Sequence, residues 1–264
     1  MVLYLLDREP WAPDFVAETG SDDSGRPCNL AGGQKEGDEM AVYGKADVLA
    51  TIRRDGLVPV FYHSDVDVAR EVARRLVSGG LSTIEFTNRG DGAIEVLADL
   101  LRWARTELPE LIVGVGSVVE AATAGQVIDL GANFVFAPAL SAEVAATCNG
   151  RNIPYVPGCG TLTEIQTAYR LGCDFVKLFP AGSIGGPSFL SAIRAPCPWV
   201  QAVPTGGVEP TVDSMKAWFD AGAPAVGMGS KLLPGDLIRS NDWDGLEARV
   251  GAAVAAVREA RGEG

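Results

Sequence analysis

Histidine is nearly absent from this sequence, and long apolar stretches are missing altogether. His63 is the only histidine among 264 residues, so a histidine-rich metal site and a Ser-His-Asp triad lack their ingredients. No run of 18 apolar residues occurs, and the opening MVLYLLDREPW is interrupted by charge too early to resemble a signal peptide. We therefore expect no membrane association and a cytoplasmic protein.

Cysteine and positive charge are also scarce. The five cysteines are scattered without a CxxC pair, which suits a reducing compartment better than a disulfide framework. Cys159, in PGCGT, has no histidine near it in sequence to activate its thiol, so we expect it to be small apolar filler. The net charge of −12 argues against nucleic acid or an anionic membrane surface as a partner.

The first forty residues differ from the rest of the chain. Residues 1–39 contain nine acidic and three basic side chains, a net charge of −6, and show no helical or strand period. We expect a disordered or loosely attached extension over residues 1–40, with a short ordered arm against the rest of the protein as the alternative. Met40, just before the first periodic segment, is an alternative candidate for the start codon. Residues 41–264 are predicted to form one domain.

From residue 45 onward, short β-rich runs alternate with segments of helical periodicity. A helical example is DVDVAREVARRLVSGG, residues 65–80, which ends at glycine. The expected strands share apolar, β-branched character and cover residues 57–62, 82–86, 111–116, 133–138, 153–158, 174–180, 199–207 and 224–230. Eight such units at near-even spacing predict an α/β fold, a closed (β/α)8 TIM barrel, rather than a doubly wound sheet.

Barrel geometry indicates where chemistry belongs, because the C-terminal ends of the strands form the active-site face. The residues that the predicted strands place at those ends are Glu85, Arg89, Ser117, Pro138, Thr161, Lys177, Gly206, Gly207, Gly229 and Ser230. Their convergence on one face is typical of a site.

Lys177 stands out because it is the only one of five lysines inside an apolar strand, DFVKLFP. One interpretation is structural: the side chain extends outward between barrel and helices, or forms half of an ion pair. The other is catalytic: an amine in the barrel lumen, neutral enough to attack a carbonyl and form a Schiff base. The convergence of Glu85 and Arg89 on the same face favours the catalytic interpretation.

Glu85 and Arg89 lie together in STIEFTNRG. Glu85 is a second charge in an apolar strand, and it suits either a buried partner for Lys177 or a general acid/base beside an imine. Arg89 offers a planar fork that matches a carboxylate, although a surface arginine after a strand is common.

The ordered motifs STIEFTNRG, IVGVGSV, VFAPAL, VPGCGTLTE, FVKLFPAG, VPTGGV and VGMGSKL resemble those of the 2-keto-3-deoxy-6-phosphogluconate / 4-hydroxy-2-oxoglutarate aldolase family, from about residue 46 to 235. The resemblance implies a class I aldolase that releases pyruvate and an aldehyde from a small 2-keto-4-hydroxy acid. It implies no metal or organic cofactor, a homotrimer, and a place in carbohydrate metabolism such as the Entner–Doudoroff route.

By position, the resemblance assigns Lys177 to the Schiff base and Glu85 to proton transfer. It assigns Arg89 and Ser117 to the pyruvyl carboxylate, with Thr161 lining the same pocket. We expect Pro138, at the end of its strand, to contact substrate as well. The remaining matches, at the phosphate end of the substrate, are Gly206, Gly207, Gly229 and Ser230. Departures such as Ser117 in place of threonine, and Lys231 after Ser230, leave the aldehyde half of the substrate open.

Two other functions remain open at this point. A phosphosugar epimerase or isomerase on the same barrel would use phosphate loops without an imine, and Lys177 opposes it. A non-catalytic keto-acid-binding barrel would keep the pocket without turnover, and the joint presence of Lys177, Glu85 and Arg89 opposes that.

Overall fold

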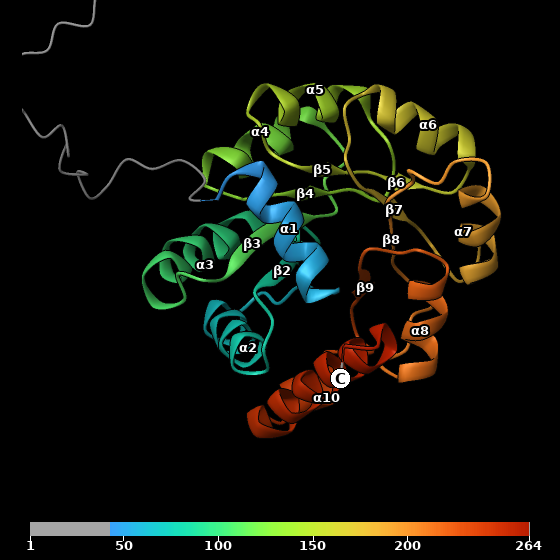
Figure 1. Cartoon of the computed structure of the whole chain (residues 1–264). Coiled ribbons are helices and arrows are strands. Elements are labelled where there is room, and N and C mark those ends of the chain that lie inside the picture. The colour runs from blue at the N-terminus through green and yellow to red at the C-terminus, as the bar shows by residue number, and fades with distance from the viewer. Residues whose placement is uncertain (1–42, 264) are drawn as a thin grey trace, which may run out of the picture. The chain divides into compact units, whose positions relative to one another are not determined.

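The computed structural model describes residues 43–263, so the extension expected over residues 1–40 lies outside the described residues. None of the described helices is both long and apolar enough to cross a membrane. The predicted (β/α)8 barrel is confirmed, with helices surrounding a ring of parallel strands (Figure 1).

All strand pairs in the barrel are parallel. The strands are β1 (Leu57–Phe61), β2 (Thr83–Thr87), β3 (Ile112–Gly116), β4 (Val135–Phe136), β5 (Tyr155–Val156), β6 (Gly158–Cys159), β7 (Val176–Leu178), β8 (Ala202–Pro204) and β9 (Val226–Met228). Six pair in the order β5-β4-β3-β2-β1-β9 and three in the order β6-β7-β8. A bridge between Thr205 and Gly227 joins β8 to β9.

The fifth expected strand, residues 153–158, is the one whose hydrogen bonding departs from the prediction. It is divided at Pro157 into β5, which pairs with β4, and β6, which pairs with β7. Proline has no N–H to donate to a ladder, so the pairing changes partner at that residue. The Pro157 carbonyl still accepts from the N–H of Lys177, at 2.8 Å, and holds the two segments of the barrel together.

The helices follow the strands and cover them from outside. They are α1 (Lys45–Asp55), α2 (Val66–Ser78), α3 (Ala93–Glu107), α4 (Ala121–Asp129), α5 (Ala142–Gly150), α6 (Leu162–Arg170), α7 (Gly186–Arg194), α8 (Val212–Asp220), α9 (Gly235–Arg239) and α10 (Trp243–Arg261). Side-chain caps explain several starts; the Asp65 carboxylate, for example, accepts from the N–H groups of Asp67 and Val68 at the start of α2.

Two separate hydrophobic clusters hold the barrel together. The larger fills the space between strands and outer helices and includes Val176 and Leu178 of β7. The smaller occupies the lumen, with Val58, Ile112, Phe134, Phe136, Val156, Phe175, Val203 and Ala225, and it also contains Val48 and Ile52 of α1. Helix α1 therefore closes the N-terminal end of the barrel, across which it lies in Figure 1.

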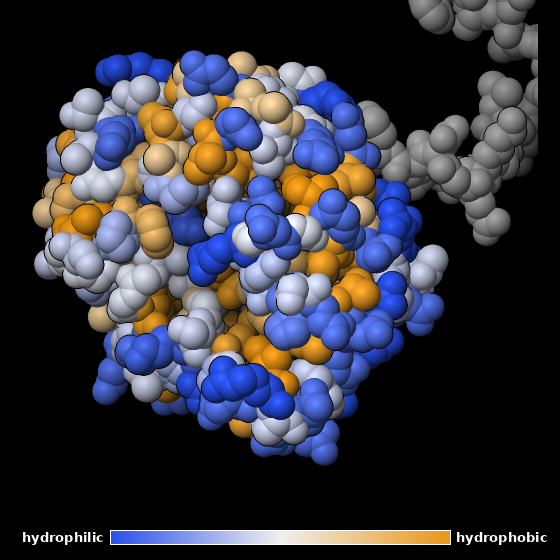
Figure 2. Space-filling model, turned by 180° about the vertical axis from the view of Figure 1, so that it is seen from behind, coloured by the Kyte–Doolittle hydropathy of each residue, from blue (hydrophilic) through white to orange (hydrophobic). Residues whose placement is uncertain are grey.

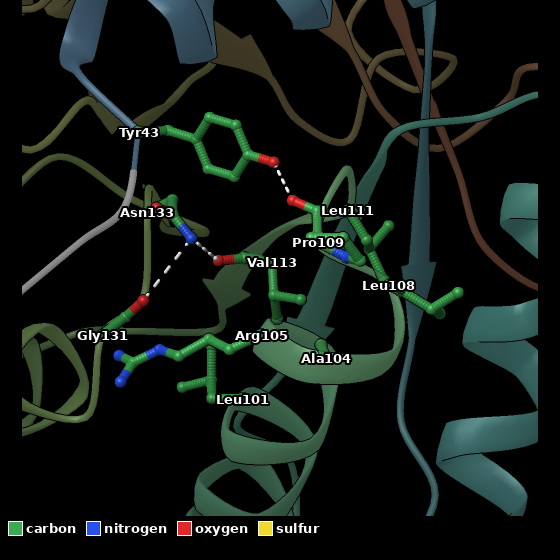
Figure 3. Close-up of a pocket in the computed structure, with 10 residues that line it drawn as sticks. All are labelled: Tyr43, Leu101, Ala104, Arg105, Leu108, Pro109, Leu111, Val113, Gly131 and Asn133. Carbon is green, nitrogen blue, oxygen red and sulfur yellow. Dashed lines mark hydrogen bonds between the residues drawn. The ribbon is translucent and has the colours of Figure 1, made fainter. Parts of the chain in front are cut away.

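A small pocket beside α1 belongs to this closed end (Figure 3). Its volume of about 50 Å³ is far below the roughly 300 Å³ of a small ligand site. The Tyr43 hydroxyl donates to the Pro109 carbonyl across it, and the Asn133 amide donates to the Val113 and Gly131 carbonyls at 3.3 and 3.5 Å. The first contact ties the segment before α1 to the residues that precede β3, and the Asn133 contacts join β3 to the residues that precede β4.

The opposite end of the barrel is visible in Figure 2, where the molecule is turned half a revolution. Hydrophilic residues there are interspersed with small apolar patches. Helix α1 covers the other end of the described barrel, so this C-terminal face is the end that α1 leaves uncovered.

Candidate active site

Lys177 lies at the middle of β7, with its side chain in the barrel lumen. The strand alternates: Val176 and Leu178 pack against the outer helices, whereas Phe175 belongs to the lumen cluster. Lys177 shares the lumen side with Phe175, and only 6% of the residue is exposed. The expectation of a lumen amine is met, and an outward-extending lysine is excluded.

Glu85 reaches Lys177 from β2, on the other side of the lumen. Its neighbours Ile84 and Phe86 pack outward, which turns the carboxylate inward. The Lys177 Nζ donates to Glu85 Oε1 at 3.3 Å and to Oε2 at 3.4 Å, and Glu85 is 1% exposed. Removal of either partner alone leaves the other charge buried without compensation, which lowers the unfolding free energy by about 3–5 kcal/mol.

Gly116, at the end of β3, provides the space that Glu85 occupies. A Cβ atom at this position would lie 1.9 Å from Glu85 Oε1, so any side chain here would displace the carboxylate. Ser117 follows immediately with a φ of 62°, a conformation that non-glycine residues seldom adopt. This turn places Ser117 half-buried at the C-terminal end of the barrel, where the predicted strand ends.

Two aromatic rings flank the amine, and sequence reasoning did not select either. The Lys177 Nζ lies 5.5 Å from the ring centroid of Phe136 and 5.4 Å from that of Phe179. Phe179 is 38% exposed, although it is a large hydrophobic residue. The available signal was its spacing of two residues from Lys177, which puts it on the same side of the chain. The rings give the amine an apolar, electron-rich environment.

Arg89 lies on the C-terminal face but makes no hydrogen bond or ion pair to Lys177, Glu85 or any other described residue. The loop that carries it is joined to β3 by the Asn88 N–H, which donates to the Gly116 carbonyl at 2.8 Å. Its exposed side chain lines a pocket that Ser230 also lines. The structure therefore brings Arg89 together with Ser230, and leaves its guanidinium without a partner.

Thr161 has a structural function at the start of α6. Its hydroxyl accepts from the Glu164 N–H at 3.2 Å, and the Glu164 carboxylate accepts from the Thr161 N–H at 2.9 Å. This reciprocal cap explains why a helix starts here, and it occupies the hydroxyl that was expected in the substrate pocket. Pro138 is exposed at the end of the fourth barrel segment, and a Cβ at Gly158 would meet its carbonyl oxygen at 2.0 Å.

Thr205 is a candidate that sequence reasoning missed. It lies two residues after Val203 of the lumen cluster, and its hydroxyl is buried without a hydrogen-bond partner. Gly227 allows this placement, because a Cβ there would lie 2.3 Å from the Thr205 Oγ1. A buried hydroxyl without a partner is unfavourable unless water or a ligand satisfies it, so Thr205 is better placed than Thr161 to meet substrate.

The glycines expected at the phosphate end lie on the same face. Gly206 and Gly207 have φ angles of 83° and 85°, which requires glycine-like freedom. A Cβ at Gly207 would lie 2.7 Å from the Cα of Gly182, in the loop that follows β7. Gly229 is half-buried and Ser230 is exposed at the end of β9.

Cys159 also lies at this end of the barrel, and it is buried, as expected for apolar filler. Burial raises the pKa of the Cys159 thiol to about 12, so the thiol stays protonated at neutral pH. We expect iodoacetamide at pH 7.5 to leave Cys159 unmodified in the native protein, as measured by peptide mass mapping. The same peptide should be fully modified in urea; rapid native labelling would contradict the buried placement.

Known proteins resemble this chain in both sequence and fold. The model described as KDPG and KHG aldolase matches residues 48–249. The chain is 31% identical over 199 residues to the 2-dehydro-3-deoxy-phosphogluconate aldolase of Pseudoalteromonas atlantica, which covers 75% of this chain and 90% of that protein.

Two solved structures agree in fold and sequence. The KDPG aldolase of Legionella pneumophila, with pyruvate captured as a covalent carbinolamine, has a TM-score of 0.69 and 26% identity, covering 78% of this chain and 97% of that one. The 2-keto-3-deoxy-6-phosphogluconate aldolase of Zymomonas mobilis ZM4, with 3-phosphoglycerate, has a TM-score of 0.71 and 28% identity, covering 80% and 96%. This chain belongs to the KDPG and KHG aldolase family.

Proposed function

We propose that this protein is a class I aldolase that cleaves a 2-keto-4-hydroxy acid to pyruvate and an aldehyde. The observation that carries the proposal is the buried pair of Lys177 and Glu85, 3.3 Å apart in the lumen near the open end of the barrel. The substrate is 2-keto-3-deoxy-6-phosphogluconate, 4-hydroxy-2-oxoglutarate or both, with glyceraldehyde 3-phosphate or glyoxylate as the aldehyde product. The capture of pyruvate in the related Legionella aldolase supports this chemistry.

In the first half of the reaction, Lys177 is the nucleophile. The Glu85 carboxylate accepts a proton from the Lys177 Nζ, which lies 3.3 Å from its Oε1. The neutral amine then adds to the C2 ketone of the substrate. Glu85 then returns this proton to the carbinolamine hydroxyl, which leaves as water, so that an iminium ion forms and Glu85 is again a carboxylate. The Arg89 guanidinium and the Ser117 hydroxyl hold the substrate carboxylate.

In the second half, a base removes the proton of the C4 hydroxyl, and the C3–C4 bond breaks. Its electron pair flows into the iminium, which leaves an enamine of pyruvate on Lys177 and a free aldehyde. Glu85, directly or through a water molecule, is the group placed to accept that proton and to return one to C3. Hydrolysis of the resulting imine releases pyruvate and restores the amine.

The remaining site residues position the substrate. Pro138 lines the substrate pocket at the end of the fourth barrel segment. The backbone of Gly206, Gly207 and Gly229 holds the distal phosphate together with Ser230. We propose Thr205 rather than Thr161 as the hydroxyl that meets substrate, since the Thr161 hydroxyl caps α6. We further propose a cytoplasmic homotrimer, which the family resemblance supports, with residues 41–264 as its aldolase domain.

Trapping with pyruvate and borohydride tests the proposal. Reduction of the imine should add the mass of one pyruvate-derived group to one peptide, and that peptide should contain Lys177. Lys216, which is paired with Asp220 on the exposed surface at 2.9 Å, serves as the internal comparison and should stay unmodified. No adduct at all would favour an epimerase, an isomerase or a non-catalytic binding protein.

A further inference from the structure

A pocket of about 360 Å³ lies at the ends of β1, β2 and β9, beside the short helix α9. Its floor is apolar, because Phe61, Leu233 and Ile238 are all buried. Its polar side chains are His63, Arg89, Ser230 and Arg239, together with the ring of Tyr62. No carboxylate lines it, although the chain as a whole carries a net charge of −12.

Most arginines in the described part of the chain have a hydrogen-bond or ion-pair partner. Among the described residues, four guanidinium groups make neither a hydrogen bond nor an ion pair: Arg89, Arg170, Arg239 and Arg258. Two of these four, Arg89 and Arg239, line the same pocket. An unpaired pair of cations over an apolar floor is a favourable site for an anion.

The protein's only histidine adds a donor to this pocket. The Nδ1 atom of His63 accepts from the Asp65 N–H at 3.0 Å, so the proton of the neutral ring is on Nε2. The ring is also stacked on Phe61, with an angle of 5° between the two planes. These two contacts fix its orientation and leave Nε2–H as the free donor.

We propose that Arg239, with the Nε2–H of His63, binds the anionic group at the far end of the substrate's aldehyde half. This inference rests on the proposed function. Because that function assigns Arg89 to the keto-acid carboxylate, Arg239 is the remaining unpaired cation of the pocket. Ser230 lines the pocket as well, so the same anion can contact its hydroxyl.

The test compares substrates that differ at the distal end. We would measure kcat/KM for 2-keto-3-deoxy-6-phosphogluconate, 4-hydroxy-2-oxoglutarate and the uncharged-end analogue 2-keto-3-deoxygluconate. Arg239→Gln should lower kcat/KM about tenfold for at least one anion-ended substrate, and less than twofold for 2-keto-3-deoxygluconate, because only a charge-assisted contact is lost. Arg239→Lys keeps the charge without the planar fork and should fall between. A loss confined to one of the two anionic substrates identifies the group that Arg239 binds.

The matched control is Arg258→Gln, which removes an equally unpaired and exposed arginine from α10. It should change none of the three values. Equal losses on all three substrates with Arg239→Gln, or no loss on either anionic one, would overturn the inference. Pyruvate trapping at Lys177 should be unchanged in Arg239→Gln, which separates this inference from the proposed function. Absence of trapping in the unmodified protein would overturn both.

Discussion

Replacement of Lys177 by methionine should abolish aldol cleavage, with a loss in kcat of at least about 10⁵-fold. Methionine retains the length and apolar character of the lysine stem but offers no amine to form the imine. The loss should be seen in steady-state pyruvate release, and borohydride should trap no adduct. Methionine is preferable to alanine here, because alanine would also leave a cavity between Phe136 and Phe179, whose rings flank the amine.

Either substitution leaves the Glu85 carboxylate buried without its partner, so stability must be measured beside activity. We expect the unfolding free energy to fall by about 3–5 kcal/mol, and the double variant Lys177→Met/Glu85→Gln to recover part of it. Lys216→Met, at an exposed ion pair, is the control for loss of a lysine and should retain full activity. A folded Lys177→Met protein with more than about one hundredth of the original kcat would refute the imine mechanism.

Glu85→Gln should lower kcat by about 10²–10⁴-fold while the pyruvate adduct on Lys177 still forms. Glutamine has nearly the same shape as glutamate, so it fits the same space beside Gly116, where a Cβ atom would lie 1.9 Å from Glu85 Oε1. The amide cannot accept and return protons, so imine formation, the cleavage step and protonation of the enamine should all slow, although the adduct should still accumulate on long incubation with pyruvate. Single-turnover kinetics and borohydride trapping on the same preparation would separate imine formation from the later steps.

The control variant for that measurement is Glu247→Gln. Glu247 lies on α10, outside the lumen, and its carboxylate forms an ion pair with Arg75 at 2.9 Å. It removes a carboxylate without touching the lumen and should leave kcat unchanged. If Glu85→Gln retained kcat within about threefold, Glu85 would be a structural partner of Lys177, and the proton transfer would belong to another group.

The sequence by itself determined the architecture and the side of the chain on which Lys177 lies. Eight apolar runs separated by helical periods predict a (β/α)8 barrel, because each unit must bury one sheet face against its own helix. Within DFVKLFP, strand alternation places Lys177 and Phe175 on the same side of the strand. It does not say whether that side faces the lumen or the outer helices. Such signals are local, since strand and helix periodicity are set by backbone geometry over a few residues.

Closure of the barrel decided what those local signals left open. Lys177 and Glu85 are 92 residues apart in the chain, and their 3.3 Å contact exists only because β2 and β7 face each other across the lumen. The plug formed by Val48 and Ile52 of α1 was not predicted, as two apolar residues per helix do not reveal which surface they meet.

Tertiary structure also decided which threonine hydroxyl and which arginines are available to bind a substrate. Thr161 and Thr205 both follow barrel strands, but one caps a helix and the other is buried in the lumen without a partner. In the sequence, nothing distinguishes Arg239 from other arginines in the last turn of a helix. It lines the pocket only because α9 packs beside the ends of β1 and β9. The physical reason is that burial, pairing and access depend on distances between segments remote in sequence, which no local pattern encodes.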